Sequence, residues 1–91
     1  MEELCAEILV TGKVQGIFYR AHTKRFALEL ELKGYVQNQE DGSVKIIVQG
    51  TKPRIKELEL WCNQGPKLAA VKTVQIQYTK PQEEFTTFER R

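Results

Sequence analysis

The sequence predicts an α+β fold in which two helices cover one face of an antiparallel sheet of four strands, or of five if a short C-terminal segment joins it. Four segments alternate between apolar and polar residues, as strands with one buried face do. Two segments of helical period follow the first and the third of these strands. A chain of 91 residues has room for one domain, residues 1–91, around one core.

The first half of the chain contains a strand, a loop, a helix and a second strand. Residues 4–11 alternate and predict the first strand. Residues 21–32 have helical period. The apolar stripe of this helix consists of Thr23, Phe26, Ala27 and Leu30, with Leu28 off the stripe. Residues 34–37 predict the second strand, so Asn38 should lie at a strand end beside a loop.

The second half begins with a hairpin. An Asp-Gly pair predicts a turn over residues 39–42, and residues 43–49 predict the third strand. Thr51 can cap a second helix that has Pro53 in its first turn. Gly65 should end this helix.

The remaining residues predict a fourth strand, a polar loop and a short edge strand. The fourth strand covers residues 71–79, and residues 85–89 can add the edge strand. The resulting order, βαββαβ, is that of a ferredoxin-like α/β sandwich with both helices on one face of the sheet.

The stretch between the first strand and the first helix predicts an anion-binding site. It reads Gly12-Lys13-Val14-Gln15-Gly16-Ile17-Phe18-Tyr19-Arg20. Gly12 and Gly16 allow a tight loop whose N–H groups can converge on one anion. The N-terminal end of the next helix adds a positive dipole, and the Arg20 guanidinium suits two oxygens of a phosphate or carboxylate. Neither a nucleotide P-loop nor a dinucleotide fingerprint is present.

Composition excludes several kinds of chemistry. The only serine, histidine and aspartate are Ser43, His22 and Asp41, and their positions do not favour a triad. Cys5 and Cys62 have neither metal-ligand nor redox spacing, and the acidic residues are scattered, so we expect no metal and no cofactor. A net charge of +2 is too balanced to favour nucleic acid or membrane. We expect a cytoplasmic monomer that works by positioning and electrostatics.

Two blocks of the sequence are similar to the acylphosphatase family. The first, Val10-Thr11-Gly12-Lys13-Val14-Gln15-Gly16-Ile17-Phe18-Tyr19-Arg20, resembles the signature V-x-G-x-V-Q-G-V-x-[FY]-R, with Ile17 in place of its last valine. The second, Gly34-Tyr35-Val36-Gln37-Asn38 with Asp41-Gly42-Ser43-Val44, resembles G-[WY]-V-x-N-x-x-D-G-x-V. The resemblance covers nearly the whole chain. Because the sequence ends at Arg91 without a linker, we expect a free-standing enzyme instead of a domain of a larger maturation protein.

The resemblance implies metal-independent hydrolysis of the carboxyl–phosphate bond of acyl phosphates, with water as co-substrate. It implies two catalytic residues, Arg20 and Asn38, with Asn38 orienting the attacking water. The phosphate would be bound at Gln15, Gly16, Ile17, Phe18, Tyr19 and Arg20, by N–H groups and the guanidinium. At Glu31 the family often has a glycine that ends the helix in a left-handed conformation, which would cost a glutamate about 1 kcal/mol.

Two alternatives to an enzyme remain from the residues alone. A non-catalytic module that binds a small anion would use the same loop without depending on Asn38. An RNA-binding module needs exposed aromatic side chains on the central strands. The second and third predicted strands contain one aromatic residue, Tyr35, so the sequence gives little support to RNA binding.

Overall fold

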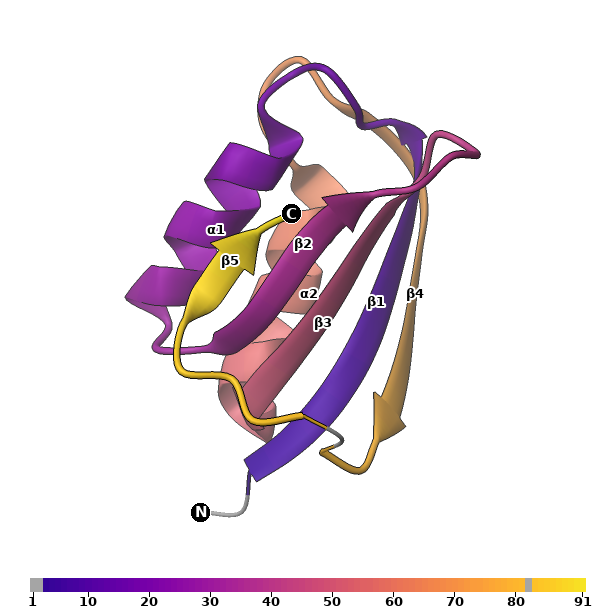
Figure 1. Cartoon of the computed structure of the whole chain (residues 1–91). Helices are drawn as coiled ribbons and strands as arrows, with labels where there is room; N and C mark the ends of the chain where they lie inside the picture. Colours follow the sequence, from indigo (N-terminus) through magenta and orange to yellow (C-terminus); the bar gives the residue numbers. More distant parts are fainter. Residues whose placement is uncertain (1–2, 82) are drawn as a thin grey trace.

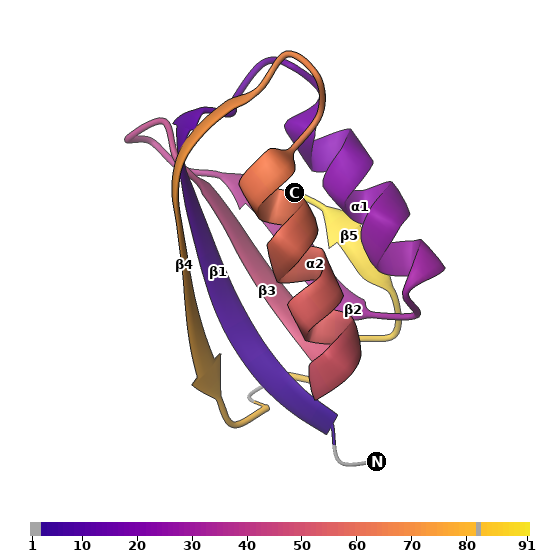
Figure 2. The same cartoon turned by 180° about the vertical axis from the view of Figure 1, so that it is seen from behind.

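The computed structural model describes residues 3–81 and 83–91 as five strands and two helices. In chain order these are β1 (Glu3–Lys13), α1 (Tyr19–Glu29), β2 (Lys33–Asn38), β3 (Val44–Thr51), α2 (Lys52–Gln64), β4 (Ala70–Thr79) and β5 (Phe88–Arg90). The expected α+β sandwich is confirmed, with both helices on the same face of one sheet (Figures 1 and 2). No helix among these residues is long and apolar enough to cross a membrane.

The strand order in the sheet is β4-β1-β3-β2-β5. The four longer strands are antiparallel, as expected, with Ile8 of β1 opposite Ile46 of β3. The edge strand β5 instead runs parallel to β2, with Phe88 opposite Gly34 and Arg90 opposite Val36. The sheet is therefore mixed, because the chain crosses from β4 to the opposite edge before β5 begins (Figure 1).

The core lies between the sheet and the helices. Every second residue of the central strands is buried there, as the period of two requires. These residues are Ala6, Ile8 and Val10 of β1 and Val44, Ile46 and Val48 of β3. The helices contribute Thr23 and Ala27 of α1 and Ile55, Leu58 and Cys62 of α2. Leu28 is exposed, in agreement with its place off the apolar stripe.

The first helix is shifted toward the N-terminus relative to the expectation. It covers residues 19–29 instead of 21–32, so Arg20 lies in its first turn. It ends early because Glu31 has φ 59, a left-handed conformation. The N–H groups of Glu31 and Leu32 donate to the carbonyl oxygens of Leu28 and Ala27, which is the Schellman pattern of a helix C-terminus. A glutamate thus occupies a position that favours glycine.

The second helix begins and ends where the sequence predicts. Thr51 is its N-cap residue but makes no side-chain capping bond, and Pro53 lies in the first turn. Trp61 packs against α1, with its ring centroid 5.7 Å from Phe26 and 5.4 Å from Tyr19. These contacts join the two helices. The contact with Tyr19 also fixes the first turn of α1, which carries Arg20.

Candidate active site

The predicted anion loop is shorter than the glycine-rich stretch. β1 continues through Gly12 to Lys13, so the loop proper covers residues 14–18. Gly12 lies at a bulge against β4, with φ 118, and a Cβ there would come within 2.2 Å of the Ala70 carbonyl oxygen. Gly12 therefore allows two strands to approach closely at the base of the loop, while Gly16 shapes the loop itself.

Gly16 and Phe18 give the loop its concave form. Their φ values, 76 and 64, are both positive, on either side of Ile17. Such alternation turns successive N–H groups toward one point and makes a nest for an anion. Among the described residues, no main-chain hydrogen bond outside the helices and strands uses an N–H of residues 15–21 as donor, and the first donor beyond them is His22. A left-handed phenylalanine is strained, which is a feature of functional sites.

Tyr19 anchors the end of this loop in the core. Its side chain is buried, and its hydroxyl donates to the main-chain oxygen of Cys62 on α2 at 2.9 Å. Burial raises the pKa of the Tyr19 phenol, so the side chain stays protonated as a donor. Only the main-chain N–H of Tyr19 can serve an anion, because its side chain is committed to packing.

Arg20 is held by the far edge of the sheet. Its Nη1 donates to the main-chain oxygen of Arg91 at 2.6 Å, just beyond β5. The main-chain N–H of Arg91 donates in turn to Val36 of β2 at 2.8 Å. Arg20 therefore has one guanidinium nitrogen occupied and others that can donate to a ligand.

Asn38 ends β2 on the helix-covered face of the sheet. It follows Val36 by two residues, so both side chains point to the same side. Its Oδ1 is buried and has no hydrogen-bond partner among the described residues. An unpaired buried acceptor is costly, so a polar ligand at this position would satisfy it.

The turn after Asn38 is held by two hydrogen bonds between Asp41 and Ser43. Asp41 accepts hydrogen bonds from the main-chain N–H and the hydroxyl of Ser43, at 2.9 and 2.6 Å. Those bonds hold the pKa of the Asp41 carboxyl below its usual value. The predicted hairpin is thereby confirmed, and the aspartate and serine serve the turn instead of a catalytic triad.

Gln15 connects the anion loop to this turn, a role that sequence reasoning missed. Its Nε2 donates to the main-chain oxygens of Gln39 and Ser43, both at 2.8 Å. One side chain thus sets the spacing between the loop and Asn38. The signal in the sequence is a glutamine between Gly12 and Gly16, but it predicts only an N–H contact with the anion.

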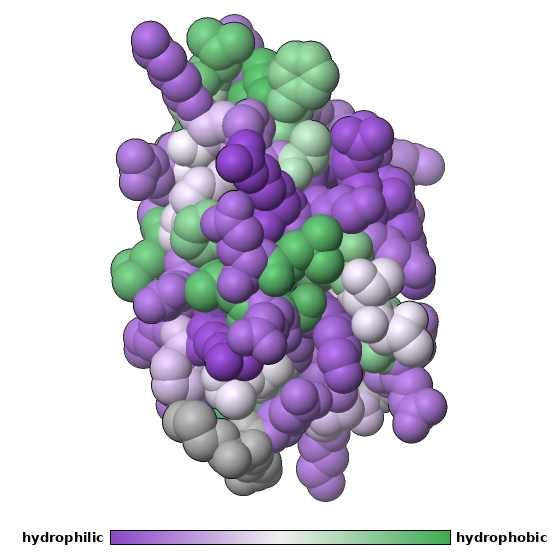
Figure 3. Space-filling view, turned by 90° about the vertical axis from the view of Figure 1, so that its left-hand side faces the viewer, coloured by the Kyte–Doolittle hydropathy of each residue, from purple (hydrophilic) through white to green (hydrophobic). Residues whose placement is uncertain are grey.

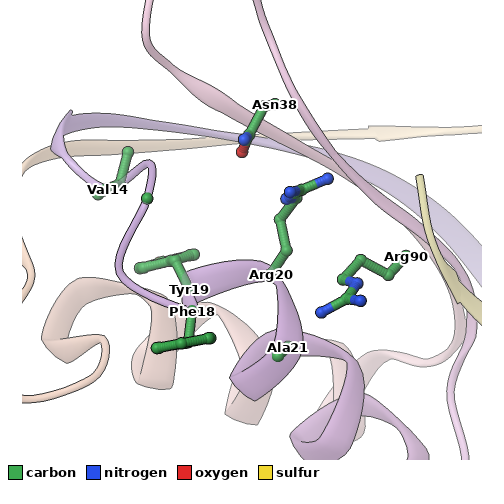
Figure 4. A pocket seen from close by; sticks show the side chains of 8 residues that line it. Val14, Phe18, Tyr19, Arg20, Ala21, Asn38 and Arg90 are labelled. Carbon is green, nitrogen blue, oxygen red and sulfur yellow. The ribbon is translucent and has the colours of Figure 1, made fainter.

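The anion loop, the first turn of α1, the end of β2 and β5 surround one hollow of about 250 Å³ (Figure 4). Its lining residues are Val14, Gly16, Phe18, Tyr19, Arg20, Ala21, Asn38 and Arg90. Five of them were predicted as site residues from the sequence, and the structure brings them together: Gly16, Phe18, Tyr19, Arg20 and Asn38. Two further predicted site residues, Gln15 and Ile17, are not among the lining residues. Arg90 was not predicted, because its place depends on the pairing of β5.

The lining is cationic and contains no general acid. Among the described lining residues two are arginines, and none is a carboxylate or a histidine. His22 is exposed on α1, and Cys62 is buried in the core. Within the described part of the chain no three His, Cys, Asp or Glu side chains gather closely enough to hold a metal ion. The arrangement can bind an anion and place a water against it.

The opposite face of the sheet does not favour RNA. Tyr35 is the aromatic residue available there on β2, and the Arg91 guanidinium lies over its ring at 4.0 Å. Phe85 lies beside the ring, with centroids 6.1 Å apart. Arg91 therefore covers one face of the Tyr35 ring and Phe85 lies next to it, so little of the ring is available for stacking with an RNA base.

Comparison with known proteins shows what this chain is similar to. The family model described as Acylphosphatase matches residues 6–90. A protein named Acylphosphatase from Marinobacter nauticus is 46% identical over 81 residues, which cover 89% of this chain and 88% of that protein. One from Vibrio cholerae is 38% identical, with 98% of each chain covered. The solved structure of an acylphosphatase from Coxiella burnetii superposes with a TM-score of 0.92 at 36% identity, covering 98% of this chain and 93% of that one.

Proposed function

The chain belongs to the acylphosphatase family and is a hydrolase of acyl phosphates, and we propose that it works by direct attack of a water held by Asn38 on a phosphoryl group held by the loop and Arg20. In this reaction the water oxygen bonds to phosphorus and the phosphorus–oxygen bond to the acyl group breaks. The acyl carboxylate leaves with the bonding electrons, and a proton of the water passes to solvent. The products are a carboxylate and inorganic phosphate.

The observation that carries this proposal is that Arg20, loop N–H groups and the Asn38 Oδ1 lie around the same hollow, with no partner for those N–H groups or for Oδ1 among the described residues. The N–H groups of residues 15–19 and the Arg20 guanidinium can donate to the phosphoryl oxygens. Donors fixed in advance stabilise the charge that spreads over these oxygens in the transition state. The fold holds the parts through Tyr19 and through the Arg20 contact with Arg91.

Asn38 supplies the acceptor. Its buried Oδ1 has no partner among the described residues, so a water that donates to it would be fixed in orientation. Fixing the water beside the bound phosphoryl group turns a chance encounter into a positioned attack. The Gln15 side chain keeps this acceptor at a set distance from the loop.

The absence of a general acid among the described lining residues suits this substrate class. An acyl phosphate releases a carboxylate, which is a weak base and leaves without being protonated. The enzyme therefore needs to orient the water and stabilise the phosphoryl charge. Asn38 orients the water, and Arg20 and the loop stabilise the charge without metal. We propose metal-independent turnover for the same reason.

Phosphate release from benzoyl phosphate in EDTA tests the mechanism. We expect fast turnover by the wild type, and a loss of about 10²- to 10³-fold in kcat for Arg20→Ala, because one preorganised donor has that effect. Asn38→Ala should lower kcat strongly while inorganic phosphate still inhibits with its wild-type constant. Gln77→Ala, an exposed amide on β4, serves as the matched control for Asn38.

Two results would contradict the proposal. Turnover of Asn38→Ala at the wild-type rate would remove the water-positioning role. A folded wild type that binds phosphate but releases none from benzoyl phosphate would mean that the loop serves only to bind an anion.

We also propose that the chain acts as one domain over residues 1–91, as a monomer in the cytoplasm, with acyl phosphate and water as its partners. The balanced charge gives no reason for a nucleic acid or membrane surface. Cys5 and Cys62 are both free and buried, which fits a reducing compartment. Size-exclusion chromatography with light scattering tests the monomer, since a mass near twice 10.5 kDa would refute it.

A further inference from the structure

Arg90 brings a second cation to the active-site hollow. It lies opposite Val36 in the parallel pairing of β5 with β2, and Asn38 follows Val36 by two residues on the same strand. Side chains at these positions share the helix-covered face of the sheet. Phe88, two residues before Arg90, is buried in the core and fixes this orientation of β5. Figure 4 shows Asn38, Arg20 and Arg90 extending from three different elements around the same space.

The charge of Arg90 is not used by the fold. Among residues 3–81 and 83–91, no carboxylate makes an ion pair with it. The side chain of the next residue, Arg91, points to the opposite face of the sheet and, unlike that of Arg90, has ion-pair partners there. It pairs with Glu83 at 3.7 Å and with Glu89 at 3.2 Å, and it covers the ring of Tyr35. Packing and ion pairing thus explain Arg91 but give no reason for Arg90.

The phosphoryl group already has its own donors in the loop N–H groups and Arg20. Arg90 adds a further guanidinium to the wall of the same hollow, without an ion-pair partner among the described residues, and so adds positive potential beside the acyl part of a bound substrate. A carboxylate or phosphate on that acyl part would pair with it, and a planar guanidinium suits either group. A neutral acyl part would gain nothing from this charge.

We propose that Arg90 is a specificity-determining residue that selects acyl phosphates whose acyl part carries a second anionic group. This inference rests on the proposed function and narrows its substrate class. The second anion is bound at the edge of the sheet, while the phosphoryl group is bound by the loop and Arg20.

The test compares substrates that share one ring and differ in one charge. These are benzoyl phosphate, 3-carboxybenzoyl phosphate and 4-carboxybenzoyl phosphate, and the measured quantity is the ratio of kcat/KM for a carboxylated substrate to that for benzoyl phosphate. For Arg90→Gln we expect this ratio to fall about fivefold, the effect of one partly exposed ion pair, with the change mainly in KM. Arg90→Lys should keep most of the preference. The wild-type preference should shrink at high salt, because ions screen an exposed pair.

Lys56→Gln is the matched control, because it removes one exposed positive charge from α2, outside the hollow. An equal fall of kcat/KM for all substrates in Arg90→Gln would overturn the inference and assign Arg90 to the phosphoryl group. An equal fall of the ratio in Lys56→Gln would also overturn it, because the preference would then come from net charge. If the wild type hydrolyses benzoyl phosphate and the carboxylated substrates with equal kcat/KM, the inference about Arg90 is refuted while the proposed function stands.

Failure of the proposed function is recognised separately. If the folded wild type hydrolyses none of the substrates, calorimetric binding of benzylphosphonate and 4-carboxybenzylphosphonate gives the same comparison without turnover. Tighter binding of the carboxylated ligand that depends on Arg90 supports the inference, and equal binding refutes it.

Discussion

Replacement of Gln15 by alanine should both destabilise the protein and impair turnover, because one side chain joins the anion loop to the turn after Asn38. The substitution removes two hydrogen bonds of 2.8 Å, to the main-chain oxygens of Gln39 and Ser43. These carbonyl oxygens each keep one other donor, since Gly42 donates to Gln39 and Gln39 donates to Ser43. Neither is left without a partner.

The magnitude follows from this bonding. A hydrogen bond contributes about 0.5–1.5 kcal/mol net, so the free energy of unfolding should fall by about 1–3 kcal/mol. Gln15→Glu should be worse than Gln15→Ala, because a carboxylate would face two carbonyl oxygens without a donor. The kcat for benzoyl phosphate should fall in both variants as the distance between loop and Asn38 loses its constraint, while Arg20 remains in place.

Urea unfolding followed by Trp61 fluorescence measures the stability, and phosphate release measures kcat. Gln77→Ala is the control, since its exposed side chain on β4 lies outside the hollow. If Gln15→Glu were as stable as the wild type, or if Gln15→Ala kept the wild-type kcat, the bridging role would be refuted.

Two further predictions concern stability. Glu31→Gly should raise the free energy of unfolding by about 1 kcal/mol, because it relieves the left-handed glutamate; it also loses an exposed pair with Arg54, which contributes little. Urea unfolding checks this, and a loss of stability would contradict it. Burial raises the pKa of the Cys62 thiol from 9.0 to about 12. Above pH 9 the thiol therefore loses its proton in the unfolded chain but keeps it in the folded protein. Because the unfolded state then binds fewer protons, the free energy of unfolding should fall as pH rises toward 12. Cys62→Ala should make that decline shallower in a pH series of melting curves, and an unchanged slope would refute the assignment.

The end of the molecule that carries the anion loop has an apolar surface beside the site. Phe18 and Leu68 are 75% and 72% exposed, and this end is largely hydrophobic in Figure 3. Phe18 also lines the hollow, so its ring can contact the acyl part of a substrate. The three substrates that test Arg90 therefore keep the aromatic ring constant and differ only in a carboxylate.

The sequence by itself determined most of the fold and the central part of the site. Periodicity predicted four strands and two helices, because an element that buries one face repeats apolar residues every two positions in a strand and every three to four in a helix. The glycines predicted a loop with unusual backbone angles, and the Asp-Gly pair placed Asn38 at a strand end. Arg20 stood out because a cation at a helix N-terminus is unfavourable without an anion.

Only the tertiary structure decided how these parts act together. β5 is three residues long, and its parallel pairing with β2 depends on the burial of Phe88, which no local pattern encodes. That pairing placed Arg90 in the hollow and the main chain of Arg91 against Arg20. The bridge made by Gln15 spans 28 residues to Ser43, and contacts of this kind exist only once the sheet has formed. Local residue preferences could therefore predict the loop, while the spacing between its functional groups came from long-range packing.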